Sequence, residues 1–392
     1  MSGYFIFILQ MLKGNIHLSR YAVAVFFFFC GLIFSSWASR IPAIKEAFHL
    51  NEAQLGTVLM MLPLGSFIAL PMAGWAVDRF SSRWMTLGSC IGYALMLYMV
   101  SVSGTVLMLS LSLFFFGFMG DLLNIAMNTQ GLDVQHRMQK PILSAFHGMW
   151  SLGALTGALV GGRTLQLTMS TTAHFTFIMI TVMIISLAVF GFLIPADDKK
   201  EEGKKLFVMP DRALWLIGLI CFCCALCEGA MADWSSLYYQ EVVNDPARVS
   251  TTGFTAYIFA MTIGRFTGDR LLVWLHYRKV LMLNSLLVAL GLSLALGFHN
   301  QTFTIIGFSL VGYGVSTVIP IAYMLAGKSK TMSASVALAV VSTIGFTGFL
   351  IGPPIIGFIA HQTGLRIALL LVLLMGMTIF FISRKIKVAE KA

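Results

Sequence analysis

One carboxylate and two amides are spaced along an apolar stretch so that they share a single helical face. Asp121 is followed at i+3 and i+7 by Asn124 and Asn128, and this spacing returns to the same side of a helix. An ionisable group in a membrane helix is costly and therefore marks a functional site by default. The carboxylate can exchange a proton, and the amides can hydrogen-bond a polar solute. The stripe favours a site for solute and proton, with interhelical hydrogen bonding as the alternative interpretation.

A second pair of carboxylates lies in the second half of the chain. Glu228 and Asp233 fall within another apolar stretch, where a low dielectric constant favours the protonated form of a carboxyl group. Glu228 lies deeper in that stretch, so we expect it to be the better proton carrier of the two. Asp233 lies nearer the outer end, where it is either solvated or part of a gate. A purely structural role is the alternative for both residues.

One histidine and several aromatic rings are further candidates. His147 can relay protons because histidine titrates near neutral pH, or it can simply hydrogen-bond between packed helices. Four rings could stack against a sugar or another ring, although each taken alone is more typical of a core or interface aromatic. These four residues are Trp37, Trp150, Trp234 and Tyr313.

The elements that must position these side chains are long apolar segments. Hydrophobic residues make up 58% of the 392 residues and charged residues 11%, against about 45–50% and about 25% in soluble domains. About 20 apolar residues cross a bilayer as a helix, which satisfies its own backbone polar groups. We expect an all-α integral membrane fold with twelve transmembrane helices. Their spans are 21–40, 53–77, 84–103, 105–130, 142–166, 174–195, 213–238, 252–274, 279–298, 302–326, 333–360 and 365–383.

The placement of lysine and arginine predicts the orientation of these helices. With a cytoplasmic N-terminus, 20 of the 26 Lys and Arg residues fall in inside segments and five in outside segments. Because cytoplasmic loops are enriched in these residues, both termini are expected in the cytoplasm. The net charge of +10 is mostly this topology signal, and it argues against nucleic-acid binding.

No catalytic or metal-binding pattern is present in the sequence. It contains no nucleophile–base arrangement, no His-Glu-x-x-His run and no Walker-type phosphate loop. Six cysteines fall in apolar spans rather than in outside loops, where they would pair. Their cluster from Cys221 to Cys227 could hold a soft metal such as Cu(I), but apolar packing is the expected role. We therefore expect neither an enzyme nor a cofactor.

A charged loop divides the chain into two similar halves. The expected organisation is an N-terminal six-helix bundle over residues 1–195, a cytoplasmic loop over 196–212 and a C-terminal bundle over 213–392. An Asp-Arg pair follows the second span of each half, at Asp78-Arg79 and at Asp269-Arg270. Internal repeats of this kind are typical of secondary transporters.

At these residues the chain resembles the major facilitator superfamily. Its first cytoplasmic loop matches the family signature at Gly74, Asp78, Arg79 and Arg83. Ser81 stands where the family usually has glycine, and Trp84 stands where a second basic residue is common. The finer resemblance is to the fucose-permease-like side of the superfamily, near the YbjJ-type bacterial inner-membrane proteins. It rests on the segments 36–40, 126–131, 147–153, 228–234, 264–268 and 352–357.

The resemblance implies two six-helix bundles that rock around a central site, with charged gates at the cytoplasmic side. Such charges stabilise the outward-open state and separate when the inside opens. Setting the topology alone would need only the positive charges, so Asp78 discriminates between the two roles. The implied gating residues are Asp78, Arg79, Arg83, Arg265, Asp269 and Arg270.

Glycines and prolines in two spans predict the packing of their helices. Gly153, Gly157 and Gly161 recur every fourth residue, which favours close helix contact. Gly352-Pro353-Pro354 is expected to interrupt span 11 with a kink. Span 5 has no Gly-Pro pair, which the resemblance would lead us to expect in a drug–proton antiporter.

The pattern as a whole predicts a secondary active transporter that moves a small polar solute, such as a sugar or related metabolite, across the cytoplasmic membrane. We expect alternating access coupled to protons, in a monomer surrounded by the lipid bilayer. Two alternatives remain open at this point. One is a proton-driven exporter of amphipathic compounds or drugs, and the other is a non-transporting membrane receptor or assembly protein.

Overall fold

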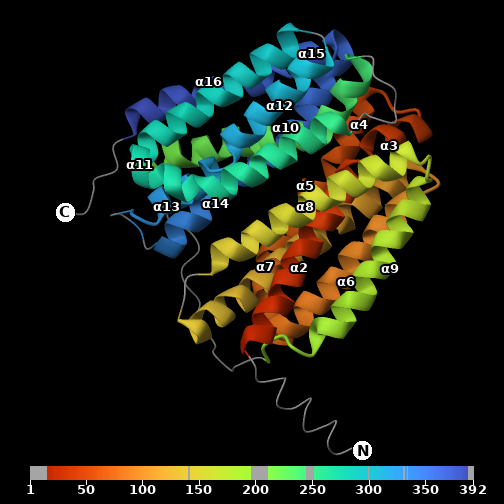
Figure 1. Cartoon of the computed structure of the whole chain (residues 1–392), viewed down its shortest axis with the longest axis vertical. Coiled ribbons are helices and arrows are strands. Elements are labelled where there is room, and N and C mark those ends of the chain that lie inside the picture. Colours follow the sequence, from red (N-terminus) through yellow and green to blue (C-terminus); the bar gives the residue numbers. More distant parts are fainter. Residues whose placement is uncertain are drawn as a thin grey trace, which may run out of the picture. The chain divides into compact units, whose positions relative to one another are not determined.

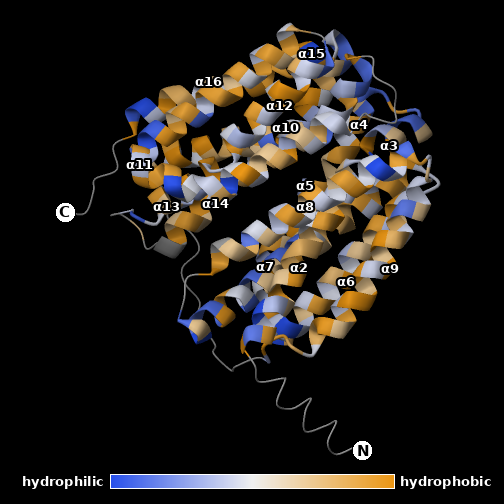
Figure 2. Cartoon of the chain, in the orientation of Figure 1, coloured by the Kyte–Doolittle hydropathy of each residue, from blue (hydrophilic) through white to orange (hydrophobic). Residues whose placement is uncertain are grey.

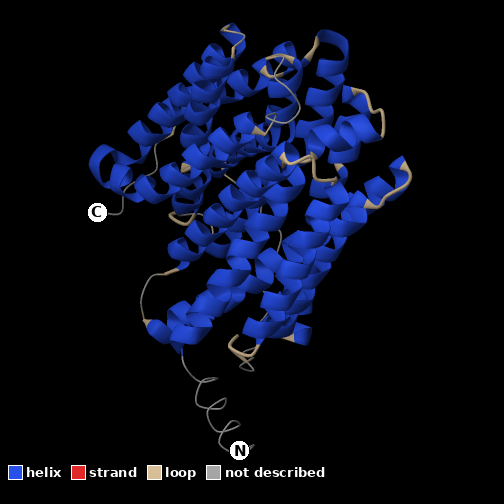
Figure 3. Ribbon diagram, turned by 45° about the vertical axis from the view of Figure 1, so that its right-hand side comes forward, coloured by secondary structure: helices blue, strands red, loops and turns tan. Residues whose placement is uncertain are grey.

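The structure is a computed structural model that describes residues 16–139, 142–195, 211–243, 251–298, 300–329, 332 and 334–386. Within these residues every regular element is a helix (Figure 3). The predicted all-α class is therefore confirmed. Most of the predicted central loop lies outside the described residues, which resume at Asp211.

The helices group into two compact units, and the grouping does not follow chain order. Unit 1 comprises residues 1–40 and 61–201, and unit 2 comprises residues 41–60 and 202–392. The segment 41–60 thus packs with helices that come much later in the sequence. The division of the chain into two halves of six helices each stays a prediction.

Unit 1 is built from paired long helices (Figure 1). The closest partners are α2 with α8, α5 with α7, α6 with α7, and α6 with α9. A Cβ added to Gly153 would lie 1.9 Å from the carbonyl oxygen of Phe28, so the predicted close packing of the glycine stripe is confirmed. The helices are α2 (Ile16–Ala38), α5 (Met61–Phe80), α6 (Ser82–Ser101), α7 (Val106–Met138), α8 (Leu143–Gln166) and α9 (Thr171–Phe190).

Unit 2 combines the remaining helices with the two short ones from segment 41–60. Here α10 packs on α14, α11 on α12 and α16, and α4 on α14. Its helices are α3 (Ile41–Ala47), α4 (Glu52–Leu59), α10 (Arg212–Glu241), α11 (Thr252–Gly297), α12 (Gln301–Val315), α13 (Val318–Ala326), α14 (Ala334–Thr363), α15 (Leu365–Ala368) and α16 (Leu370–Lys385).

Two helices of unit 2 need separate description. α14 runs through Gly352-Pro353-Pro354 as one helix, and the kink expected there stays a prediction. Neighbouring helices can compensate for the hydrogen bonds that proline removes within a membrane helix. In contrast, α11 contains a non-helical residue, His276, with φ 61° and ψ 144°, so it consists of two helical parts.

Residues of high hydropathy dominate most of these helices (Figure 2). Ten helices among the described residues are long and apolar enough to cross a membrane, which makes this a multi-pass membrane protein. Two expected spans, 142–166 and 252–274, are helical as α8 and the first part of α11 but are not among the ten. Twelve spans therefore stay a prediction.

Candidate functional site

The polar stripe predicted in span 4 is a connected hydrogen-bonded group on α7. Asn128 Nδ2 donates to the backbone oxygen of Asn124 at 2.7 Å and to its Oδ1 at 2.8 Å. Asn124 also hydrogen-bonds the Asp121 carboxylate. The expected sharing of one face is therefore confirmed. The second carboxylate oxygen, Oδ2, is buried and has no hydrogen-bond partner among the described residues.

Apolar and aromatic groups of α6 lie beside Asp121. A Cβ added to Gly120 would lie 3.0 Å from the Tyr93 ring and 3.4 Å from its hydroxyl, so this ring lies directly against α7. Tyr93 is buried and its ring centroid lies 4.3 Å from that of Phe116. A charged carboxylate with an open oxygen is costly in such surroundings. Asp121 is therefore suited to bind a proton or a polar group.

The candidates on α8 and α2 divide into accessible and buried side chains. His147 is exposed, and its ring packs edge-on against Phe27 at 5.3 Å. Trp150 is half-buried, with its ring 6.2 Å from Phe34. Trp37 is only 1% exposed, which favours core packing over stacking against a solute.

In unit 2, the carboxylate of Glu228 lies in electrostatic range of an arginine. Arg265 of α11 acts on both Glu228 and Tyr257, and Cys224 Sγ lies 3.8 Å from Glu228 Oε1. We had expected Arg265 to form part of a charged gate. The structure associates it with the α10 carboxylate, and its part in a gate stays a prediction.

Asp233 is half-buried rather than solvated at the helix end. Its neighbours along α10, Ala232 and Trp234, are 6% and 0% exposed, so Trp234 is a core residue. Tyr313 is half-buried, and its hydroxyl lies 3.0 Å from Thr267 Oγ1. This contact joins α12 to α11.

Among the expected gate charges of unit 1, Arg83 contacts backbone oxygens and an aromatic ring. Asp78 and Arg79 are exposed. Arg83 Nη2 lies 3.4 Å from the carbonyl oxygens of Phe190 and Gly191, and its guanidinium lies 4.5 Å above the Phe190 ring. A basic side chain in this position satisfies the last carbonyls of a helix.

The second pair of expected gate charges is described only in part. Arg270 is exposed on α11. The side chain of Asp269 lies outside the described part of the structure.

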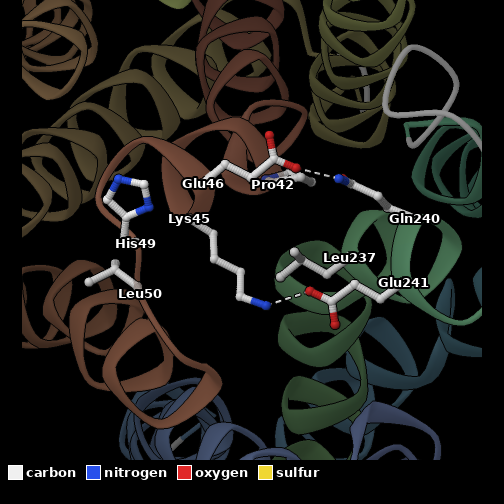
Figure 4. Close-up of a pocket in the computed structure, with 8 residues that line it drawn as sticks. All are labelled: Pro42, Lys45, Glu46, His49, Leu50, Leu237, Gln240 and Glu241. Atoms are coloured by element: carbon white, nitrogen blue, oxygen red, sulfur yellow. Dashed lines mark hydrogen bonds and ion pairs between the residues drawn. The ribbon is translucent and has the colours of Figure 1, made fainter.

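Sequence reasoning missed a charged network where segment 41–60 meets α10 and α14 (Figure 4). Lys45 Nζ lies 2.8 Å from Glu52 Oε1 and also pairs with Glu241 Oε1. Gln240 Nε2 donates to Glu46 Oε1. We call these contacts the Lys45 network, which includes His361 Nδ1 at 3.6 Å from Glu52 Oε2.

The Lys45 network borders a cavity of about 400 Å³. Burial alone would lower the pKa of Lys45, but its hydrogen bonds to Glu241 and Glu52 outweigh burial and raise that pKa. Lys45 is therefore charged at neutral pH. Its sequence separation from Glu241 left no local pattern that could have revealed the pair. The lining residues are Pro42, Lys45, Glu46, His49, Leu50, Leu237, Gln240 and Glu241.

Beside this network, α4 and α14 approach each other backbone to backbone. A Cβ on Gly56 would lie 2.5 Å from the carbonyl oxygen of Pro353, and one on Gly357 would lie 2.5 Å from that of Glu52. Only glycine allows such proximity at both positions. Glycine contacts and the Lys45 network together hold α4 against α14.

Gln130 is a second residue whose role the sequence did not reveal. Its side chain is fully buried, and Nε2 donates to Ser82 Oγ at 2.8 Å and to the Ile194 oxygen at 2.9 Å. Gln130 Oε1 accepts from the Ile194 amide at 2.9 Å. This one amide links α7, the start of α6 and the chain that follows α9.

Arg40 is a buried charge just beyond the end of α2. Only 3% of it is exposed, and Nη2 donates to Thr164 Oγ1 at 2.8 Å and to the Met169 oxygen at 3.0 Å. Its Nε lies 3.3 Å from His174 Nδ1. Arg40 therefore fastens the end of α2 to α8 and α9.

Comparison with known proteins gives relatives along nearly the whole chain. An uncharacterized MFS-type transporter of Yersinia pestis is 33% identical over 353 residues, which cover 90% of this chain and 92% of the relative. Membrane protein MosC of Rhizobium meliloti is 30% identical, with 91% of this chain and 88% of the relative covered.

Solved structures of the same fold have low sequence identity to this chain. A variant of the nucleoside transporter NupG matches with a TM-score of 0.79 at 13% identity, covering 95% of this chain and 100% of that one. A variant of the E. coli fucose:proton symporter FucP matches with a TM-score of 0.64 at 19% identity, covering 94% and 98%.

The family model described as Major Facilitator Superfamily matches residues 21–330. Together with the named transporters among the relatives, this match indicates a transporter rather than an enzyme. The chain therefore belongs to the major facilitator superfamily.

Proposed function

We propose that this protein is a proton-coupled secondary transporter that carries a small polar solute across a bacterial inner membrane by alternating access. In this proposal it acts as a monomer with both termini in the cytoplasm. The observation that carries the proposal is Asp121, a carboxylate midway along the apolar helix α7 with one buried oxygen open among the described residues. Such a group binds a proton or a donor of the solute.

The three polar residues of α7 divide the work between proton and solute. Protonation of Asp121 removes a charge that is costly in apolar surroundings, so a loaded site changes conformation more easily than an empty charged one. Asn124 and Asn128 supply amide donors and acceptors to hydroxyl or carbonyl groups of the solute. Tyr93, against Gly120, supplies an aromatic wall.

Glu228 is the second candidate for the proton, and an arginine beside it distinguishes it from Asp121. Arg265 acts on this carboxylate, and a nearby positive charge favours the ionised form. We therefore assign Glu228 and Arg265 to solute binding or to holding α10 against α11. Asp121 carries the coupling proton.

A binding screen identifies the solute before transport is assayed. Sugars and nucleosides head the screen because two proteins of the same fold are named for fucose and nucleoside transport. Ligand at about 100 times its dissociation constant stabilises a protein by about 2.7 kcal/mol, which a thermal shift detects. Stabilisation only by amphipathic cations would favour the exporter instead.

The coupling role of Asp121 is tested by Asp121→Asn in proteoliposomes. We expect loss of proton-driven uptake with solute counterflow retained, because the amide hydrogen-bonds but cannot exchange a proton. Glu228→Gln is the matched carboxylate variant: it should weaken solute binding or stability, but the uptake that remains should still be driven by protons. Full proton-driven uptake by Asp121→Asn would remove Asp121 from the mechanism.

We further propose that the Lys45 network is the outside gate. α3 and α4 are joined through the chain to α5 of unit 1, yet their charged contacts are with α10 and α14. In this proposal these contacts open when the site faces outward. Part of their strength comes from partial burial, because exposed pairs contribute only about 0–1 kcal/mol.

Cross-linking tests the gate at the contact between α3 and α10. Glu46→Cys and Gln240→Cys replace two residues that touch, and all six native cysteines are buried. A thiol-cleavable bifunctional reagent should stop transport in the double variant, and cleavage of the reagent should restore it. Each single variant, treated alike, serves as the control. Undiminished transport by the fully cross-linked protein would show that this contact need not open.

A further inference from the structure

A groove with basic and apolar walls lies between the start of α10 and the end of α16. It encloses about 740 Å³. Its basic side chains are Arg212, Arg384 and Lys385, all of them exposed, and its apolar wall includes Leu216 and Phe381. This end of unit 2 is the one that lysine and arginine placement predicts to be cytoplasmic.

The described lining of the groove is positively charged, and hydrogen bonds hold the two helix ends that form it. None of the described residues that line it is acidic. The nearby carboxylate of Asp211 accepts a hydrogen bond from the Leu214 amide at 2.9 Å and so caps α10. Arg278 of α11 donates from Nε to the Ser383 oxygen at 3.1 Å and also contacts the Arg384 oxygen, which secures the end of α16.

Basic and apolar side chains together suit the groove to a ligand that has both a negative charge and a hydrocarbon part. Guanidinium and ammonium groups donate charge-assisted hydrogen bonds to phosphate oxygens, and the apolar wall offers a surface for hydrocarbon. Aromatic side chains are enriched at membrane–water interfaces. Two exposed aromatic residues lie here: Phe381 is 53% exposed, and Trp215, one helical turn after Arg212, is 52% exposed. A soluble phosphate would make no use of the apolar wall.

We propose that this groove binds an anionic phospholipid of the cytoplasmic leaflet, with its phosphate held by Arg212, Arg384 and Lys385. Basic pockets between transmembrane helices on the cytoplasmic side are suited to anionic head groups. The acyl chains lie along Leu216 and Phe381. Bound lipid then bridges the first and last helices of the C-terminal part of the chain, α10 and α16.

Lipid binding to the purified full-length protein tests the proposal. Native mass spectrometry in neutral detergent measures retention of phosphatidylglycerol against phosphatidylcholine. The double variant Arg384→Gln with Lys385→Gln should weaken phosphatidylglycerol binding about thirtyfold. Each basic residue near an anionic surface contributes about 1 kcal/mol, and each change of about 1.4 kcal/mol changes the affinity about tenfold. The matched control, Lys279→Gln with Lys328→Gln, removes the same charge from two exposed lysines elsewhere in unit 2.

Each outcome supports or overturns the proposal. Selective loss of phosphatidylglycerol in the groove variant, with the control unchanged, supports it. Equal loss in both variants would mean that overall charge attracts the lipid, and equal retention of phosphatidylcholine would remove the anionic specificity. Full displacement of lipid by millimolar inorganic phosphate would make the groove a site for a soluble anion instead.

Discussion

Two turns, one in each unit, share a backbone conformation and an arginine contact but differ in the residues around them. Ser81, before α6, has φ 74° and ψ 137°, and His276, within α11, has φ 61° and ψ 144°. Two residues later, Arg83 and Arg278 each contact backbone oxygens at the end of another helix, α9 and α16 respectively. The members of both pairs are 195 positions apart in the chain.

This correspondence sets the register of the internal repeat. At a separation of 195 positions, the counterparts of Asp78 and Arg79 are Val273 and Trp274, which are 83% and 81% exposed. The Asp-Arg pair noticed in the sequence of the second half lies four residues earlier, about one helical turn away. Only the turn of the first half therefore has an acid and a base at the positions of Asp78 and Arg79. The two turns do not carry equivalent charges.

The same comparison explains a departure from the family signature. Ser81 occupies the position where the family usually has glycine, and its positive φ is a conformation that glycine adopts without strain. Serine is accommodated here with its side chain accepting a hydrogen bond from the Arg83 amide at 3.3 Å. At this position of the chain the turn therefore requires a positive φ, which a glycine would meet more easily than Ser81 does.

The largest difference between the two halves lies in one residue. Beside the turn at Ser81 this residue is Gln130 of α7, and its counterpart in unit 2 is Leu325, an apolar residue that is 2% exposed. We expect Gln130→Leu to lower the free energy of unfolding by about 2–3 kcal/mol, because it leaves the buried Ile194 amide and oxygen without their partner. Thermal unfolding in detergent measures the loss. Gln166→Leu, at an exposed glutamine, is the control and should have little effect. Equal effects of the two substitutions would deny Gln130 its role.

A smaller effect is expected from the two arginines themselves. Arg278→Gln should lower the free energy of local unfolding at the end of α16 by about 1.5 kcal/mol, the lower end of the value for hydrogen bonds to a charged group, because Arg278 is only half-buried. Arg83→Gln should cost less, because Gln130 still holds the chain after α9. Hydrogen exchange of peptides from the ends of α9 and α16 compares the two. Faster exchange at α9 than at α16 would reverse the comparison.

Local patterns in the sequence predicted the features that depend on short spacing. Asp121, Asn124 and Asn128 could be assigned to one face because helical periodicity alone brings them together. The close approach at Gly153 likewise followed from a four-residue repeat. Both are properties of a single helix.

Features that depend on distant partners could not be predicted in this way. Lys45 and Glu241 are separated by 196 residues, and no periodicity connects them. In the sequence Gln130 is only part of a segment that resembles the family. Its structural role depends on hydrogen bonds to Ile194, which is 64 residues away. Arg83 read as a gate charge because the sequence shows a cation but not the helix carbonyls that it contacts.

The tight glycine contacts between helices also bear on how the two halves of the chain evolved. Gly153 approaches the Phe28 oxygen in unit 1, and Gly348, 195 positions later, approaches the Phe222 oxygen in unit 2, where a Cβ would lie 2.3 Å away. The two glycines keep the offset of the turns, and the residues whose oxygens they approach differ from it by one position, a pattern that duplication of an ancestral half-length gene would leave. Between Ser81 and Gly153, and between their copies, evolution has retained no net insertion or deletion, although the side chains have diverged almost completely.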